Sequence, residues 1–370
     1  MGIDVGKLKR AVIKIGTSVI TDDKGRLDKT QLRKIIKQIA GLKKSGREII
    51  IITSGSIAAG VEKLGLEARP KGIQKLQAAA SVGQGLLIGE YSKYFEPYRI
   101  AVGQVLLTQA DFIHREEYLN AQNALNKLLE LGIVPVINEN DATAVEEIRF
   151  GDNDIISALV SCFIHADVLI MLSDVDGIYL EDKDGKKVLK KEIKKIGEEV
   201  ERDAKGAVSK FGSGGMTTKV RAAKIVTSSG VQMVIANGRR ENILNSIFQG
   251  DFIGTYFYPR EGRLASKKHW IAYVLPSKGK LVVDAGARIA LVKGKKSLLP
   301  AGVIGVEGDF SIGEAVEISD DKGDVFAKGV TSYHSDEINK VKGMRTCDLL
   351  GILNETICDE VVHRDSLVIF

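Results

Sequence analysis

The sequence is poor in cysteine and aromatic residues and contains no long apolar run. Its three cysteines, Cys162, Cys347 and Cys358, lie far apart and form no Cys-x-x-Cys pair, which argues against a disulfide framework or a zinc site. No stretch approaches the roughly 20 apolar residues that a membrane-spanning helix needs. The first ten residues also lack the apolar segment of a signal peptide. We therefore expect a cytoplasmic protein that does not associate with membranes.

Several common catalytic signatures are also missing. There is no G-x-x-x-x-G-K-[ST] phosphate loop, no H-E-x-x-H zinc motif and no G-x-S-x-G serine elbow. Gly83-Gln84-Gly85 begins like a dinucleotide-binding glycine motif but lacks the third glycine at the right offset. The net charge of +5 is too small to indicate nucleic acid, although it suits anionic substrates such as nucleotides.

The first 260 of the 370 residues alternate between strand and helix patterns. Residues 48–53 form a continuous β-branched run, which is typical of a strand buried on both faces of a parallel sheet. Asp28 is expected to open a helix, with Gln31 as its capping-box partner. The alternation predicts an α/β domain over residues 1–260, a three-layer sandwich with helices on both faces of a mainly parallel sheet.

The pattern changes after Pro259. Residues 261–275 begin with a charged stretch without periodicity, so we expect a linker there. From residue 276 to 370 short strands alternate with turn signals, such as Asp284-Ala285-Gly286 and Pro300-Ala301-Gly302. This spacing predicts a small β-barrel domain with a C-terminal tail.

Six polar segments follow expected strands or open expected helices, the places where an open α/β sheet binds its ligands. They are residues 14–18, 53–60, 138–141, 151–154, 173–177 and 213–219. Lys14 stands inside an apolar strand, where a buried ammonium group is unfavourable unless an anion meets it. The glycines and hydroxyls before Lys219 can surround an anion at a helix start. Each segment alone could also be a solvent-reaching lysine, a turn or a helix cap, but their shared placement indicates an anion-binding enzyme.

These segments also carry a family resemblance. The motifs are VIKIGTS at 12–18, ITSGSIAAG at 52–60, VPVINEND at 134–141, GDND at 151–154, residues 173–177, and GGMTTK at 214–219. Together they resemble the amino-acid kinase superfamily and, within it, the glutamate 5-kinases. VVDAGA at 282–287 and SLLPAGVIGV at 297–306 resemble a PUA domain.

The resemblance implies a fold and a reaction. It implies the amino-acid kinase fold followed by a small β-barrel PUA domain. It also implies ATP-dependent phosphorylation of the L-glutamate γ-carboxylate to L-glutamyl 5-phosphate, the first step of proline biosynthesis. A carboxylate nucleophile is already ionised near neutral pH and needs no general base, which agrees with the missing catalytic signatures.

The resemblance also implies roles for individual residues. Lys14 and Lys219 would neutralise charge on opposite sides of the transferring phosphoryl group, and Asp154 would orient both lysines. Backbone N–H groups of Gly16 and Gly55 would point at the reacting atoms. Glutamate would be bound by Ser54, Gly55, Asp141 and Asn153, with Asp141 facing the α-ammonium group. ATP would be bound by Lys14, Gly16, Ser173, Asp174, Ser213, Gly214, Gly215, Met216, Thr217, Thr218 and Lys219. Mg²⁺ would accompany the phosphates, and we name no protein ligand for it.

Two alternatives remain open. The chain could be another member of the superfamily, an aspartate or acetylglutamate kinase, although the NEND and GDND motifs argue against this. It could also bind RNA through its PUA-like part, but the sequence after Lys278 has few clustered arginines and few aromatics, so RNA binding is not expected. The resemblance further implies feedback inhibition by proline and a homo-oligomer.

Overall fold

The computed structural model describes residues 8–108, 110–113, 115–143, 153–182, 185–205, 215–251, 253–259, 266–273, 275–344 and 360–370. The chain forms two compact units, Met1–Arg263 and Leu264–Phe370. Each unit has its own cluster of buried apolar side chains.

The first unit is built on an eight-stranded sheet in the order β3-β4-β2-β1-β5-β9-β10-β8. The strands are β3 (Val102–Leu107), β4 (Val134–Glu139), β2 (Glu48–Ile52), β1 (Arg10–Ile15), β5 (Val168–Ser173), β9 (Gln232–Asn237), β10 (Thr255–Phe257) and β8 (Glu192–Ile193). Neighbouring strands run parallel except β9 and β10, which are antiparallel. The predicted mainly parallel sheet is therefore confirmed.

The central strand β1 shows how the apolar runs form this sheet. Its residues Ala11, Ile13 and Ile15 alternate along the strand and join the core on one face of the sheet. Val12 and Lys14 consequently point to the opposite face. Val12 is fully buried and Lys14 is 7% exposed. The Lys14 ammonium group is therefore buried on the face of the sheet opposite to Ile13.

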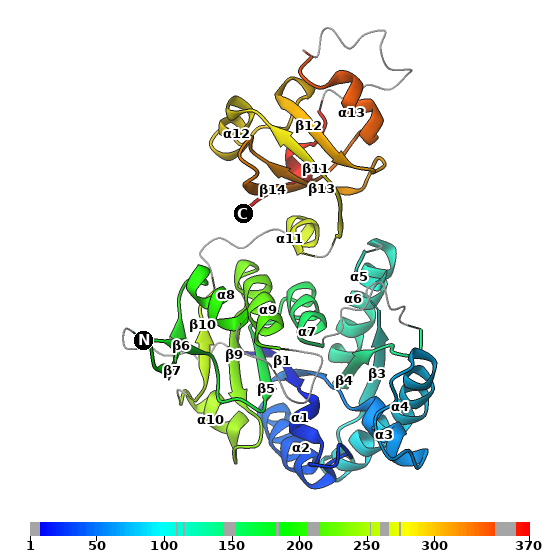
Figure 1. The fold of residues 1–370 in the computed structure, drawn as a ribbon. Helices are drawn as coiled ribbons and strands as arrows, with labels where there is room; N and C mark the ends of the chain where they lie inside the picture. The colour runs from blue at the N-terminus through cyan, green and yellow to red at the C-terminus, as the bar shows by residue number, and fades with distance from the viewer. Residues whose placement is uncertain are drawn as a thin grey trace. The chain divides into compact units, whose positions relative to one another are not determined.

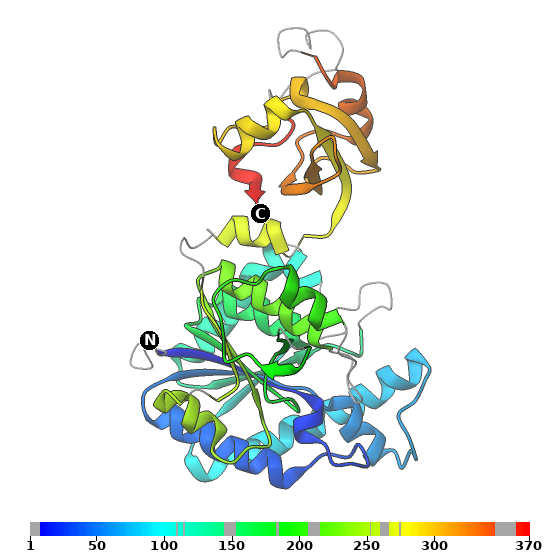
Figure 2. The same ribbon diagram turned by 60° about the vertical axis from the view of Figure 1, so that its left-hand side comes forward.

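Helices cover both faces of the sheet (Figures 1 and 2). The face that carries Ile13 is covered by α1 (Thr17–Ile20), α2 (Lys29–Lys44), α4 (Ile73–Phe95) and α10 (Ile243–Gln249), with α3 (Ser56–Lys63) beside α4. The opposite face is covered by α5 (Ala110–Ile113), α6 (Arg115–Glu130), α7 (Asn153–Phe163), α8 (Glu198–Lys205) and α9 (Met216–Ser228). A short hairpin joins β6 (Tyr179–Glu181) to β7 (Lys187–Leu189). Among the described helices, none has both the length and the apolar character needed to traverse a bilayer.

The start of α2 confirms half of the predicted capping box. The Asp28 side chain accepts a hydrogen bond from the Gln31 backbone N–H at 2.9 Å, as expected of an N-cap. The reciprocal half is wrong, because the Gln31 side chain donates instead to the Gly238 carbonyl at 2.7 Å. Gln31 therefore ties α2 to the end of β9.

The second unit contains a five-stranded sheet in the order β12-β11-β13-β14-β15. Its elements are α11 (Ser266–Tyr273), β11 (Ser277–Val283), α12 (Ala285–Val292), β12 (Val303–Gly308), β13 (Ala315–Ser319), β14 (Val325–Val330), α13 (Ser335–Val341) and β15 (Leu367–Ile369). The turn expected at residues 284–286 is wrong, because Asp284 caps α12 by accepting from the Ala287 N–H at 2.7 Å. The range 261–275, expected as a linker, contains α11, which contacts β14 and β15.

Candidate active site

Three charged side chains meet above the carboxyl end of β1. Lys14 comes from β1, Asp154 from the first turn of α7 and Lys219 from the first turn of α9. Lys14 Nζ lies 2.6 Å from Asp154 Oδ1, and Lys219 Nζ lies 3.1 Å from Asp154 Oδ2. One carboxylate therefore bridges two ammonium groups, and the structure brings the three predicted catalytic residues together.

This cluster is buried. Asp154 is fully buried, and the side chains of Lys14 and Lys219 are each 8% exposed. Burial alone would raise the pKa of Asp154, but the ammonium groups of Lys14 and Lys219 outweigh it and hold that pKa well below its usual range. The cluster carries two positive charges and one negative charge, so its net charge favours an anion beside the lysines.

Thr218 adds a third contact to the bridging carboxylate. Its hydroxyl lies 3.0 Å from Asp154 Oδ2 and 2.7 Å from the Gly215 carbonyl. Gly215 precedes α9 in an extended conformation. The start of α9 is thereby fixed to the start of α7, which holds Lys219 against Asp154.

The Gly16 N–H is used within the sheet, which conflicts with its predicted role as a donor to the reacting atoms. Its N–H donates to the Leu172 carbonyl at 3.0 Å, extending the β1–β5 ladder, so it is already used. A Cβ atom at this position would lie 3.1 Å from the Leu172 oxygen and 3.8 Å from Lys14 Nζ. A side chain at Gly16 would therefore crowd the Leu172 carbonyl and lie in contact with the Lys14 ammonium group.

A hydrogen-bond network lies at the ends of β2 and β4. Asn153 Nδ2 lies 2.9 Å from the Thr53 carbonyl, 3.0 Å from Ser54 Oγ and 3.0 Å from Asn138 Oδ1. Asn138 Nδ2 donates in turn to Gln84 Oε1 on α4 at 2.8 Å. Two of the predicted glutamate-binding residues, Ser54 and Asn153, are thus in direct contact.

The other two predicted glutamate-binding residues lie at the same strand ends. Gly55 precedes α3 in a left-handed conformation with φ of 96°, which favours glycine. Ser56, the first residue of α3, donates from Oγ to Asp141 Oδ2 at 3.1 Å. This bond links the loop after β2 to the loop after β4, so Ser54, Gly55, Asp141 and Asn153 form one group.

The remaining predicted nucleotide-binding residues that the structure describes come from the end of β5 and the start of α9, and Asn237 at the end of β9 lies beside the loop after β5. Ser173 ends β5, and its hydroxyl donates to Asp174 Oδ1 at 3.1 Å. Asn237, which ends β9, donates from Nδ2 to Asp176 Oδ1 at 3.3 Å. Met216, Thr217 and Thr218 open α9 behind Gly215. Ser213 and Gly214 lie outside the described residues.

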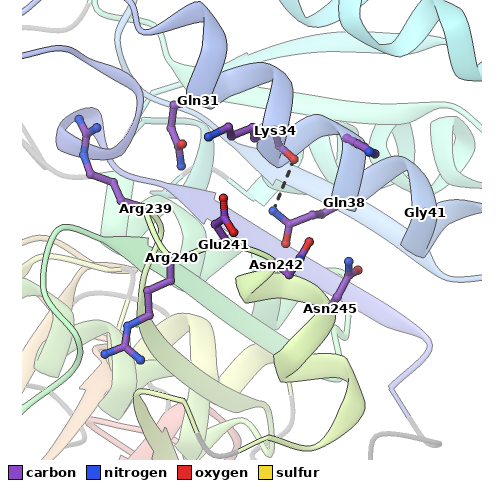
Figure 3. Close-up of a pocket in the computed structure, with 10 residues that line it drawn as sticks. Gln31, Lys34, Gln38, Gly41, Arg239, Arg240, Glu241, Asn242 and Asn245 are labelled. Carbon is purple, nitrogen blue, oxygen red and sulfur yellow. Dashed lines mark hydrogen bonds between the residues drawn. The ribbon is translucent and has the colours of Figure 1, made fainter.

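A separate cleft lies between α2 and the segment that joins β9 to α10 (Figure 3). Its volume is about 290 Å³, and Lys34, Lys37, Arg239 and Arg240 contribute four cationic side chains to its lining. Arg239 is held in place by hydrogen bonds to the Ser18 carbonyl, at 2.9 Å, and to the Thr21 carbonyl. None of the predicted site residues lines this cleft, so it is distinct from the lysine cluster.

Two residues outside the predicted segments, Gln84 and Tyr91, contact the site, and Ser56 lies inside segment 53–60 without a predicted role. Tyr91 is fully buried on α4, and its hydroxyl donates to Thr53 Oγ1 at 2.8 Å. Gln84 and Tyr91 lie more than 25 positions from the motifs they contact, on a helix that looks purely structural. The one available signal was Gly83, a glycine inside a helix, which indicates a close approach of another backbone.

The chain is similar to known proteins over nearly its full length. Residues 9–237 match the model of the amino acid kinase family. The chain is 46% identical over 364 residues to a glutamate 5-kinase of Caldanaerobacter subterraneus subsp. tengcongensis, covering 97% of each chain. The chain belongs to the glutamate 5-kinase group of the amino acid kinase family. A glutamate 5-kinase of Moorella thermoacetica is 42% identical over 367 residues, covering 99% of this chain and 97% of the relative.

Two further similarities concern the architecture of this amino acid kinase. Residues 279–353 match the PUA domain model, which confirms the expected C-terminal module. The crystal structure of N-acetylglutamate synthase from Neisseria gonorrhoeae matches 70% of this chain and 62% of its own, with 14% sequence identity and a TM-score of 0.50. At this identity the match supports the fold alone. As a member of a kinase family, the chain uses ATP as its co-substrate.

Proposed function

We propose that this chain transfers the γ-phosphoryl group of ATP to the γ-carboxylate of L-glutamate, giving L-glutamyl 5-phosphate in the first step of proline biosynthesis. The observation that carries the proposal is the buried cluster in which Asp154 bridges Lys14 and Lys219. The 46% identity to a glutamate 5-kinase over nearly the full chain supports glutamate as the acceptor.

The cluster suits phosphoryl transfer because this chemistry depends on alignment and charge neutralisation more than on covalent help. In our proposal Lys14 and Lys219 meet oxygens on opposite sides of the transferring group, and Asp154 keeps both ammonium groups in place before the substrates arrive. The glutamate carboxylate attacks the γ-phosphorus, the bond to the bridging oxygen breaks, and ADP leaves. No proton has to be removed from the nucleophile.

Glutamate recognition is proposed for the group at the ends of β2 and β4. Asp141 would pair with the α-ammonium group, Ser54 and the backbone of Gly55 would hold the carboxylates, and Asn153 would complete the site by orienting Ser54 through its Nδ2. ATP would lie toward β5 and β9, against Ser173, Asp174 and residues 213–219, with Gly16 leaving room beside Lys14.

Mg²⁺ is proposed as the companion of ATP. Both carboxylate oxygens of Asp154 contact lysine ammonium groups, whose positive charge disfavours a metal ion beside them. The hard oxygen ligands that Mg²⁺ prefers would come from phosphate oxygens and water.

A substrate panel tests the proposed function. Coupled measurement of ADP release should show that kcat/KM for glutamate exceeds that for aspartate and for acetylglutamate by at least about 100-fold, about 2.7 kcal/mol. Equal or higher kcat/KM with aspartate or acetylglutamate would assign the chain to the corresponding alternative kinase.

Further properties are proposed from the family resemblance. We expect a cytoplasmic homo-oligomer that proline inhibits, and we expect the PUA domain to serve packing or regulation and not RNA binding. Repeating the substrate panel with proline tests the inhibition, and light scattering after gel filtration tests the oligomer. Binding of structured RNA that weakens steeply with salt would restore the RNA alternative.

A further inference from the structure

The helix α4 reaches the glutamate-binding group through glycine contacts. A Cβ atom on Gly83 would lie 1.8 Å from the Ser56 carbonyl oxygen, and one on Gly60 would lie 1.8 Å from the Ala79 carbonyl oxygen. Because these positions carry no side chain, the backbones of α3 and α4 touch. The next residue after Gly83 is Gln84, which is thereby brought to the end of β4.

The direction of the hydrogen bonds in this network follows from one atom. The Thr53 backbone carbonyl can only accept, so the Asn153 atom that faces it at 2.9 Å is the amide nitrogen. That nitrogen also faces Asn138, so the facing Asn138 atom is Oδ1. Asn138 Nδ2 then points at Gln84, and the Gln84 atom that meets it at 2.8 Å must accept.

The same assignment of donors and acceptors determines which hydrogen bond the Ser54 hydroxyl can still make. Asn153 Nδ2 shares its two N–H groups among three oxygens and cannot accept, so Ser54 Oγ, 3.0 Å away, is the acceptor in this contact. The Ser54 hydroxyl proton is therefore available to donate elsewhere. A substrate carboxylate is an acceptor of this kind. If Asn138 turned its amide around, two N–H groups of Asn138 and Asn153 would face each other in a buried setting, since Asn138 is 1% exposed.

We propose that Gln84 is a positioning residue of the glutamate site. Its side-chain oxygen accepts from Asn138 Nδ2 and thereby holds the Asn138 amide in the one orientation that Asn153 and Ser54 require. The inference rests on the proposed function, because it assigns Gln84 to recognition of the acceptor substrate. It also gives a purpose to the Gly83-Gln84-Gly85 segment, which matches no complete nucleotide motif.

Three substitutions at position 84 in the full-length chain separate the direction of the bond from charge. Gln84→Glu keeps an acceptor, Gln84→Met removes it, and Gln84→Lys offers only donors. Charge alone would favour the lysine variant, because an added cation attracts anionic glutamate and an added carboxylate repels it. The proposal predicts the opposite order, with a lower KM for glutamate in Gln84→Glu than in Gln84→Lys. Gln74→Met, an exposed position on the same helix, serves as the control.

The measurement is steady-state kinetics, first with glutamate varied at saturating ATP and then with ATP varied at saturating glutamate. Gln84→Met and Gln84→Lys should raise KM for glutamate about tenfold or more, while KM for ATP changes less than about twofold. Gln84→Glu should stay within about threefold of the wild type and thus act as the conservative rescue. Unchanged thermal unfolding, with an unchanged KM for ATP, would show that the fold is intact.

Several results would overturn the inference. One is a normal KM for glutamate in Gln84→Met and Gln84→Lys. Another is a KM for glutamate in Gln84→Glu as high as that in Gln84→Lys. A third is a rise in KM for ATP equal to the rise in KM for glutamate. Failure of the proposed function is distinguishable, because the wild-type chain would then not phosphorylate glutamate at all.

Discussion

Single residues decide the chemistry of this site, and the two lysines bound by Asp154 are the clearest case. Lys14→Ala or Lys219→Ala should lower kcat by about 100- to 1,000-fold, because each removes one preorganised positive charge from the transferring group. Lys224→Ala is the matched control: Lys224 also lies on α9 but pairs with Glu201 in a half-exposed position. The control should keep kcat within about twofold. Near-normal kcat in both test variants would remove the cluster from catalysis.

Asp154 also makes a prediction about pH. Its pKa in the folded chain lies well below the ordinary value of 3.8, so the unfolded chain binds the proton more readily. The stabilisation by ionised Asp154 is therefore complete above about pH 5 and declines as the pH falls below about 4.

Urea unfolding of the wild type and Asp154→Asn checks this sign. The asparagine variant, which leaves two buried ammonium groups without their carboxylate, should be less stable by about 3–5 kcal/mol at neutral pH. The difference should shrink as the pH drops below about 4. A difference that grows on acidification would contradict the assigned direction of the pKa shift.

Residues of the site could be predicted where the sequence itself was anomalous. Lys14 inside an apolar strand and the polar runs after β2 and β4 are visible without a structure. The hydrogen bond from the Gly16 N–H to the Leu172 carbonyl could not be predicted from the sequence, because it depends on the pairing of β1 with β5. Gln84 escaped for a similar reason, since its contact arises only once α4 packs against α3.

At the scale of elements, the packing of α4 on α3 controls where Gln84 lies. Gly83→Ala should destabilise the first unit by about 1–3 kcal/mol and raise KM for glutamate, because its methyl group would overlap the Ser56 carbonyl. Gly85→Ala is the control on the same helix: nothing lies within 4 Å of its added Cβ. That change should stabilise the helix by about 0.5–1 kcal/mol. Thermal unfolding and glutamate kinetics of Gly83→Ala and Gly85→Ala test this prediction. Equal stability and equal KM for glutamate in the two variants would contradict the close packing of α4 on α3.

Elements were predictable where the pattern was long and continuous. The apolar residues around Lys14 and the run 48–53 indicated β1 and β2, and Asp28 indicated the start of α2. Short elements were not predictable, because β8 and β10 contain only two and three residues. The segment 284–286 predicts a turn although Asp284 caps α12, because a capped helix and a turn favour the same opening residues.

At the scale of the molecule, the chain divides into two units with separate cores. Every described residue of the candidate site lies in the first unit. A chain truncated after Arg263 should therefore keep kcat and KM for glutamate within about threefold of the full chain. Loss of activity in a truncated chain that retains its circular-dichroism spectrum would show that the second unit contributes to catalysis.

The central claim is that the lysine cluster transfers a phosphoryl group to the glutamate γ-carboxylate. Such a product is an acyl phosphate, which hydroxylamine converts to a stable hydroxamate. With ATP, glutamate and hydroxylamine, the wild-type chain should form γ-glutamyl hydroxamate in step with ADP, and Lys219→Ala should form almost none. ADP release without hydroxamate, or equal hydroxamate formation by Lys219→Ala, would contradict the account.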